Sequence, residues 1–117
     1  MKTQANDQVT PAETAEILRL AEQCLTQNIA GDFVELGCYR GDTSILLGKL
    51  LQQHQSTSQP SPIPSRRLWI YDSFAGLPAK TPEDASSAGQ NFQAGELAIT
   101  KREVATKIHR AGLRNVI

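Results

Sequence analysis

The sequence predicts an α/β fold in which helices alternate with about three parallel strands. Strand-like apolar stretches at 33–36 and 68–71 each lie between stretches with helical periodicity, an alternation typical of parallel sheets with helices on their faces. Two glycines follow the first strand, where α/β folds turn into the next helix. With 117 residues, 39% of them hydrophobic and 21% charged, the chain resembles one soluble globular domain.

Residues 1–30 are expected to form an N-terminal helical segment. A capping box runs from Thr10 to Glu13, with proline at the first helical position, and this combination starts helices. Apolar residues then recur at helical spacing and predict a face that packs on a core: Ile17, Leu18, Ala21, Cys24 and Leu25. We expect Asn28 and Gly31 to end the helix.

Residues 31–117 are expected to hold the N-terminal half of a larger α/β domain. Phe33–Leu36 reads as a short buried strand, and helix signals resume at Asp42. The expected apolar face of that second helix consists of Ile45, Leu46, Leu47, Leu50 and Leu51. The segment 55–66 contains three prolines and several serines, so we expect a surface loop there.

The rest of the chain repeats the strand–helix order. Leu68–Tyr71 is rich in β-favouring apolar residues and predicts a second buried strand, followed by a polar loop. A capping box from Thr100 to Glu103 opens a third helix, with Val104, Ile108 and Leu113 expected to face inward and Gly112 to end it. Asn115–Ile117 resembles the start of a third strand, which predicts a truncated fold.

Charge and cysteine content argue against several functional classes. Twelve basic residues balance twelve acidic ones, so no field favours nucleic acid or an anionic membrane. The basic pairs Arg66-Arg67 and Lys101-Arg102 are expected to be solvated surface. The chain shows no membrane-length apolar run and no signal peptide, and its two cysteines fit no disulfide or metal pattern. We therefore expect a cytoplasmic protein without nucleic-acid or membrane partners.

The loop from Glu35 to Gly41 has the pattern acid-x-Gly-x-x-x-Gly. Gly37 allows a sharp turn off the strand, and Gly41 allows the backbone to approach a ligand closely. The helix beginning near Thr43 presents free amide donors and the positive end of its dipole. Glu35 can accept hydrogen bonds from a cationic amine or orient the loop. Ligands of open parallel sheets bind at this edge of the sheet.

Three nucleotide-binding patterns compete for this loop. A nicotinamide or flavin site requires G-x-G-x-x-G, and the central glycine is absent. A P-loop requires Ser or Thr after Gly-Lys, but Gly48-Lys49 is followed by Leu50 inside a helical stretch. The S-adenosylmethionine pattern fits, although a purely structural turn could carry the same two glycines.

Asp72 follows the second strand and strengthens the case for an adenosyl ligand. An ionised carboxylate can accept both hydroxyls of a ribose, and this strand is expected to neighbour the first. The structural alternative is an Asx-turn or a cap in the following loop. Acids at the ends of two neighbouring strands together favour S-adenosylmethionine.

Two stretches resemble the macrocin O-methyltransferase family: residues 31–41, and Leu-Trp-Ile-Tyr-Asp-Ser-Phe-Ala-Gly-Leu-Pro at 68–78. Residues 92–97 and 112–117 are also similar to that family, so the resemblance covers the chain from about Gly31 onward. It implies a Rossmann-like class I methyltransferase fold. It also implies methyl transfer from S-adenosylmethionine to a hydroxyl of a sugar or related small-molecule acceptor, with a divalent metal such as magnesium.

The resemblance further implies a set of cofactor-binding residues. Glu35, Gly37 and Gly41 would shape the methionine pocket, and Asp72 would hold the ribose. The other members would line the pocket through their backbone, open the following helix or border the adenosine: Cys38, Tyr39, Arg40, Thr43, Ser44, Ser73 and Phe74. Tyr39 stands where many methyltransferases outside this family have a glycine, a position at which this family tolerates a bulkier residue.

By the same resemblance, the metal-binding acids and the catalytic base lie beyond the third strand, outside this sequence. Glu83 and Asp84 are expected to be first-turn acids after Thr81-Pro82, so we assign no catalytic and no metal-binding residue. We do not expect the chain alone to be active, and the alternative is an inactive cofactor-binding or interaction module. An exposed sheet edge would favour self-association or pairing with another chain.

Overall fold

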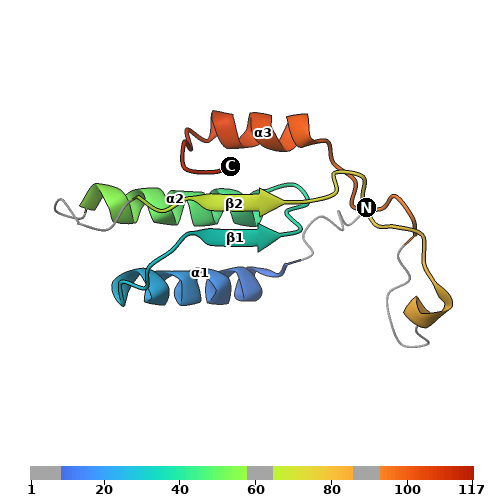
Figure 1. Ribbon diagram of the computed structural model, residues 1–117, viewed down its shortest axis with the longest axis horizontal. Helices are drawn as coiled ribbons and strands as arrows, with labels where there is room; N and C mark the ends of the chain where they lie inside the picture. Colours follow the sequence, from blue (N-terminus) through green and yellow to red (C-terminus); the bar gives the residue numbers. More distant parts are fainter. Residues whose placement is uncertain (1–8, 58–64, 86–92) are drawn as a thin grey trace.

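The computed structural model describes residues 9–57, 65–85 and 93–117 (Figure 1). Its elements follow the predicted order of alternating helices and strands. They are α1 (Pro11–Thr26), β1 (Phe33–Leu36), α2 (Asp42–Thr57), β2 (Leu68–Tyr71), the short 3-10 helix η1 (Pro82–Asp84) and α3 (Lys101–Arg110). The first two predicted strands are present at their predicted bounds.

The helix starts are fixed by local hydrogen bonds, as their sequences predict. At α1 the Glu13 amide donates to the Thr10 hydroxyl at 3.2 Å, and the Thr10 amide donates to the Glu13 carboxylate at 2.7 Å. The same reciprocal pair joins Thr100 and Glu103 at the start of α3. Asn28 adopts a positive φ of 53° just after α1, which ends the helix where expected.

The strands β1 and β2 pair in parallel, with Phe33 opposite Leu68 and Leu36 opposite Tyr71. The predicted third strand is reduced to one parallel bridge, between Leu68 and Val116. Backbone hydrogen bonds of 2.8 Å support this bridge on both sides. A contact of this length does not make a strand, so the described part of the chain contains a two-stranded sheet rather than three strands.

The core lies between the sheet and the helices α1 and α2. It consists of Ala21, Leu25, Leu47, Leu51 and Leu68, with partly buried neighbours that include Phe33 and Ile70. The expectation that both strands are buried is wrong for the opposite face, where Val34 is 60% and Leu36 79% exposed. The side chains of a strand alternate between faces, and in the described residues α1 and α2 cover one of them.

Two further expectations need correction. Residues 55–57, assigned to a surface loop spanning 55–66, continue α2, and 58–64 lie outside the described residues. Arg66, expected to be solvated, is buried and donates hydrogen bonds to the Gly31 carbonyl at 3.2 Å and to the Ile29 carbonyl. Its guanidinium satisfies carbonyls of the loop between α1 and β1, where backbone groups have no ladder partner.

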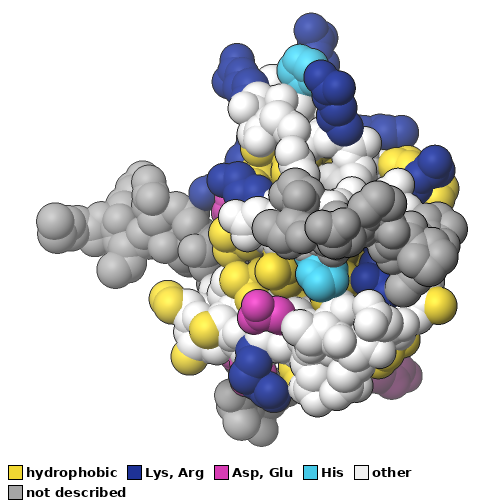
Figure 2. All heavy atoms as spheres, turned by 90° about the vertical axis from the view of Figure 1, so that its left-hand side faces the viewer, with side chains coloured by type: hydrophobic (Ala, Val, Ile, Leu, Met, Phe, Trp, Pro, Cys, Tyr) yellow, Lys and Arg dark blue, Asp and Glu magenta, His cyan; other side chains and the backbone are white. Residues whose placement is uncertain are grey.

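Exposed basic side chains gather around α3. Figure 2 shows them at the upper end of the molecule, where Figure 1 places this helix. Of the helices in the described residues, none is long and apolar enough to cross a membrane.

Candidate functional site

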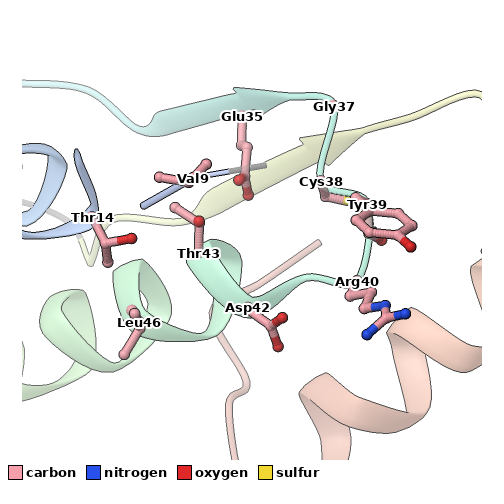
Figure 3. Close-up of a pocket in the computed structure, with 10 residues that line it drawn as sticks. All are labelled: Val9, Thr14, Glu35, Gly37, Cys38, Tyr39, Arg40, Asp42, Thr43 and Leu46. Atoms are coloured by element: carbon pink, nitrogen blue, oxygen red, sulfur yellow. The ribbon is translucent and has the colours of Figure 1, made fainter. Parts of the chain in front are cut away.

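The predicted site lies where the carboxyl ends of β1 and β2 meet the start of α2. A cavity of about 170 Å³ opens there (Figure 3). Six of the predicted site residues line it, together with four others: Glu35, Gly37, Cys38, Tyr39, Arg40 and Thr43, with Val9, Thr14, Asp42 and Leu46. Figure 3 shows Glu35 on β1 and Thr43 on α2 pointing toward one another across this space.

The glycine loop makes the predicted turn. The Gly37 amide donates to the Tyr71 carbonyl at 2.7 Å, which extends the sheet pairing into the loop. Gly37 and Gly41 have φ values of +86° and +79°, a region in which glycine meets no Cβ penalty. Tyr39 also has a positive φ, of 43°. Since this conformation costs a non-glycine residue about 1–2 kcal/mol, the structure explains why a glycine would suit this position.

Asp72 ties the ends of the two strands together. One carboxylate oxygen accepts the Cys38 and Tyr39 amides at 2.9 and 3.2 Å, and the other accepts the Phe74 amide at 2.9 Å. Burial raises the pKa of Asp72, but these amide hydrogen bonds outweigh it and leave the pKa below its usual value. An ionised Asp72 therefore holds the glycine loop in place, and the Phe74 bond forms the Asx-turn that was the structural alternative.

Glu35 contributes a second carboxylate to this edge of the sheet. It accepts a hydrogen bond from the hydroxyl of Ser44, which is fully buried in the first turn of α2. Burial raises the pKa of Glu35, the Ser44 bond opposes this, and the nearby Asp72 charge adds to the rise. The pair connects the end of β1 to the start of α2, so Ser44 positions Glu35 from behind rather than lining the cavity.

Cys38 is buried in the loop at 6% exposure. Burial raises the pKa of its thiol to about 11, with further contributions from the charges of Asp72 and Glu35. Since the thiolate is the reactive form, this cysteine is suited to packing and not to nucleophilic chemistry.

Five predicted residues do not line the cavity: Gly41, Ser44, Asp72, Ser73 and Phe74. The Ser73 hydroxyl donates to the Gly76 carbonyl at 3.2 Å and so closes a turn. Phe74 lines a separate hollow beside α3, shared with Trp69 and Tyr71. Asp72 lines the same hollow as Phe74, so the chain after β2 borders the space beside α3 and not the cavity.

Sequence reasoning missed several residues that the tertiary structure brings to the site. Val9 and Thr14 reach the cavity because α1 packs against α2. Lys107 on α3 donates to the Arg40 carbonyl at 2.7 Å and to the Asp42 carboxylate at 2.8 Å. No sequence signal links Lys107 to Arg40, which lies 67 residues earlier in the chain. The sequence predicts a helix around Lys107 but not the loop that this side chain contacts.

Acidic residues elsewhere have local roles. Asp84 accepts hydrogen bonds from the Thr81 amide and hydroxyl at 2.9 and 3.0 Å, as expected for a first-turn acid. In the described part of the chain, no three His, Cys, Asp or Glu side chains form a group that could hold a metal ion.

Comparison with known proteins shows which family the sequence matches. Residues 7–116 match the macrocin-O-methyltransferase (TylF) family. A Streptomyces olivaceus protein named 8-demethyl-8-(2,3-dimethoxy-alpha-L-rhamnosyl)-tetracenomycin-C 4'-O-methyltransferase is 31% identical over 96 residues, which cover 79% of this chain and 34% of the relative. The demethyldecarbamoylnovobiocin O-methyltransferase of Streptomyces niveus is 34% identical over 62 residues, covering 53% of this chain and 21% of the relative. The chain thus spans about a third of the first relative and about a fifth of the second.

Proposed function

The chain belongs to the macrocin-O-methyltransferase family, and from this premise we propose that it binds S-adenosylmethionine in the cavity beside the glycine loop. The bound methyl donor would serve transfer to a hydroxyl of a sugar or related small molecule. The observation that carries the proposal is the Glu35 carboxylate, which faces a cavity walled by the loop from Gly37 to Gly41. One relative is named for a rhamnosyl-bearing compound, which supports a sugar hydroxyl as acceptor.

The residues around the cavity fit a cationic, amine-bearing ligand. A Cβ at Gly37 would meet no heavy atom within 4 Å, so the backbone there is open to close approach. The first turn of α2 has amide donors without helical partners, and Glu35 offers a negative charge opposite them. Glu35 would hold the ammonium group and the amides the carboxylate of a methionine moiety. When bound, S-adenosylmethionine supplies an electrophilic methyl group on a sulfonium.

The cavity encloses only part of such a ligand. Small-molecule sites are commonly about 300–1,000 Å³, whereas this one measures about 170 Å³. The methionine end fits this volume best because the charged groups that suit it, Glu35 and the start of α2, lie here. The adenosine would extend toward Asp72.

Asp72 has limited capacity for a ribose. A carboxylate offers about four acceptor positions, and three amides already occupy it. One ribose hydroxyl can be added without breaking these bonds, while two would require one amide to be released. We therefore assign Asp72 first to positioning the loop and second to a single ribose hydroxyl.

We propose binding without turnover for the 117-residue chain. Removing a proton from a sugar hydroxyl requires a positioned base or a metal that lowers its pKa. One oxygen of Glu35 accepts the Ser44 hydroxyl and the carboxylate is assigned to the ammonium group of the methyl donor, while Asp72 accepts backbone amides, so neither is assigned as that base. The alternative hypothesis of an inactive binding module therefore remains part of the proposal for this chain, and magnesium would require ligands beyond the described residues.

Calorimetric titration of the chain with S-adenosylhomocysteine tests the proposal. We expect saturable binding that Glu35→Gln weakens about tenfold, because an ammonium group loses a charged partner. Glu96→Gln is the matched control, since Glu96 does not line the cavity and should bind as the wild type does. Absence of heat and of any thermal shift at millimolar ligand would overturn the cofactor assignment.

Two parallel measurements separate the alternatives. Titration with NADH tests the hypothesis that the loop binds a nicotinamide cofactor. If the chain bound NADH saturably and did not bind S-adenosylhomocysteine, that hypothesis would replace the proposal. Transfer of a labelled methyl group to glycoside acceptors by this chain would contradict the expectation of binding without turnover.

A further inference from the structure

A second hollow lies next to the cavity, between the end of the glycine loop and α3. It measures about 390 Å³, and its lining includes Arg40 from the loop and Arg102, Thr106, Lys107 and Arg110 from α3. We call it the arginine groove. Arg40 lines both the groove and the cavity, and Figure 3 shows its side chain directed toward α3. A ligand in the groove would therefore lie beside a ligand in the cavity.

The groove carries an excess of positive charge. The two ion pairs among the described residues are Arg19 with Glu16 and Lys107 with Asp42, so none involves the guanidinium groups of the groove. The one acid in its lining is Glu103. Hydrogen bonds from Thr100 hold the pKa of Glu103 below its usual value, so this group is ionised. Three arginines against one carboxylate leave an excess of two positive charges in the lining. The Arg40 guanidinium lies over the Tyr39 ring, 5.2 Å from its centroid, a contact that leaves its charge in place.

The arginines line the groove from both of its walls. Arg102 and Arg110 lie eight residues apart on one face of α3, about 12 Å along its axis, and Arg40 approaches from the loop opposite. A guanidinium presents a planar fork of N–H donors that matches phosphate oxygens. Lys107, paired with Asp42 and the Arg40 carbonyl, fixes the loop against the helix, so the two walls keep their spacing.

We propose that the arginine groove binds the phosphate group of a small molecule next to the methyl-donor cavity. The excess of two positive charges matches a phosphate dianion, and a hollow of about 390 Å³ admits a small molecule. The zero net charge of the chain argues against a long polyanion such as RNA. Binding in the groove does not require the methyl donor, so its failure and that of the proposed function can be told apart.

The test is titration of the full 117-residue chain with a hexose 1-phosphate, inorganic phosphate and pyrophosphate, at about 0.15 M salt to screen diffuse attraction. We expect one saturable site for which Arg102→Gln/Arg110→Gln lowers affinity at least about tenfold, since charged hydrogen bonds are lost. Lys101→Gln/Arg114→Gln removes the same charge from exposed positions outside the groove. This matched control should change affinity less than about threefold, and circular dichroism should show that both variants keep their helices.

The outcomes divide clearly. Tighter binding of the hexose 1-phosphate than of inorganic phosphate would identify a phosphorylated organic ligand, and equal affinity would identify the free anion as the source. An equal loss in both double variants would mean diffuse electrostatics and overturn the proposal. The proposal would also be overturned if no saturable binding appeared up to about 10 mM ligand, which corresponds to a binding free energy weaker than about 3 kcal/mol. An RNA oligonucleotide that displaces the hexose phosphate with far higher affinity would overturn it too.

Discussion

Replacement of Asp72 by asparagine should loosen the candidate site by a predictable amount. The carboxylate accepts amides from the glycine loop and from its own turn at 2.9 to 3.2 Å. Asparagine keeps one acceptor oxygen and turns an N–H₂ donor toward the remaining amide donors, so one or two of the bonds are lost. Each hydrogen bond to a charged group contributes about 1.5–3 kcal/mol. Because Asp72 is partly exposed, water can form some of the lost hydrogen bonds in its place. We therefore expect the free energy of unfolding to fall by about 2 kcal/mol, near the lower end of that range.

Urea unfolding followed by tryptophan fluorescence measures this loss. Trp69 is the single tryptophan and lies in β2, three residues before Asp72. With an m-value of about 1–2 kcal/mol/M, Asp72→Asn should lower the midpoint by about 1–2 M. Asp84→Asn is the matched control, because Asp84 caps only the short η1 and should shift the midpoint far less.

The pH dependence gives the same prediction a second test. Because the pKa of Asp72 is lowered in the folded state, its stabilising effect is complete above the unfolded-state pKa of about 3.9. The effect is lost as the pH falls through the folded-state value. The difference between wild type and Asp72→Asn should therefore be full at neutral pH and shrink below about pH 4. Equal midpoints at neutral pH, or a difference that persists in acid, would refute the reasoning.

Two other predictions concern the loops. The buried Cys38 thiol has its pKa raised to about 11, so it should resist alkylation by iodoacetamide at pH 8 until the chain is unfolded. The partly exposed Cys24 should be alkylated first, as measured by mass spectrometry. Alkylation of Cys38 before Cys24 would contradict a closed glycine loop. Gly76→Ala places a Cβ 2.5 Å from the Glu96 carbonyl oxygen at a φ of +79°, so hydrogen exchange should rise about tenfold in the two segments that meet there. Gly95→Ala, with similar φ and no close atom, is its control and should have a smaller effect.

Much of the fold follows from local sequence signals. The capping boxes at Thr10 and Thr100 fix helix starts through contacts three residues apart, and strands of four residues were found from their apolar content. Apart from the longer α2, the errors come from the position of other elements, which neighbouring residues do not show. Arg66 was expected to be solvated because adjacent basic residues usually lie on the surface, yet it is buried and bonded to the loop that leaves α1.

The candidate site shows the same division. The acidic residues and glycines that indicate the site lie in two short stretches of the sequence. The conformational preference of Gly37 and Gly41 is enough to predict the turn between β1 and α2. The sequence could indicate the local bond from the Phe74 amide to Asp72, as an Asx-turn. It could not indicate that Asp72 also accepts the Cys38 and Tyr39 amides, because these two donors come from the end of the other strand. Nor could it indicate that Phe74 turns away from the cavity.

The sequence by itself determined the order of the elements, the helix caps, the turn of the glycine loop and the resemblance to a methyltransferase family. These depend on the chemistry of neighbouring residues. Only the tertiary structure decided that Lys107 fixes α3 against the loop and that Arg40, Arg102 and Arg110 share one groove. Such contacts depend on how the helices pack, and charges scattered along the chain acquire a joint role only when the fold brings them together.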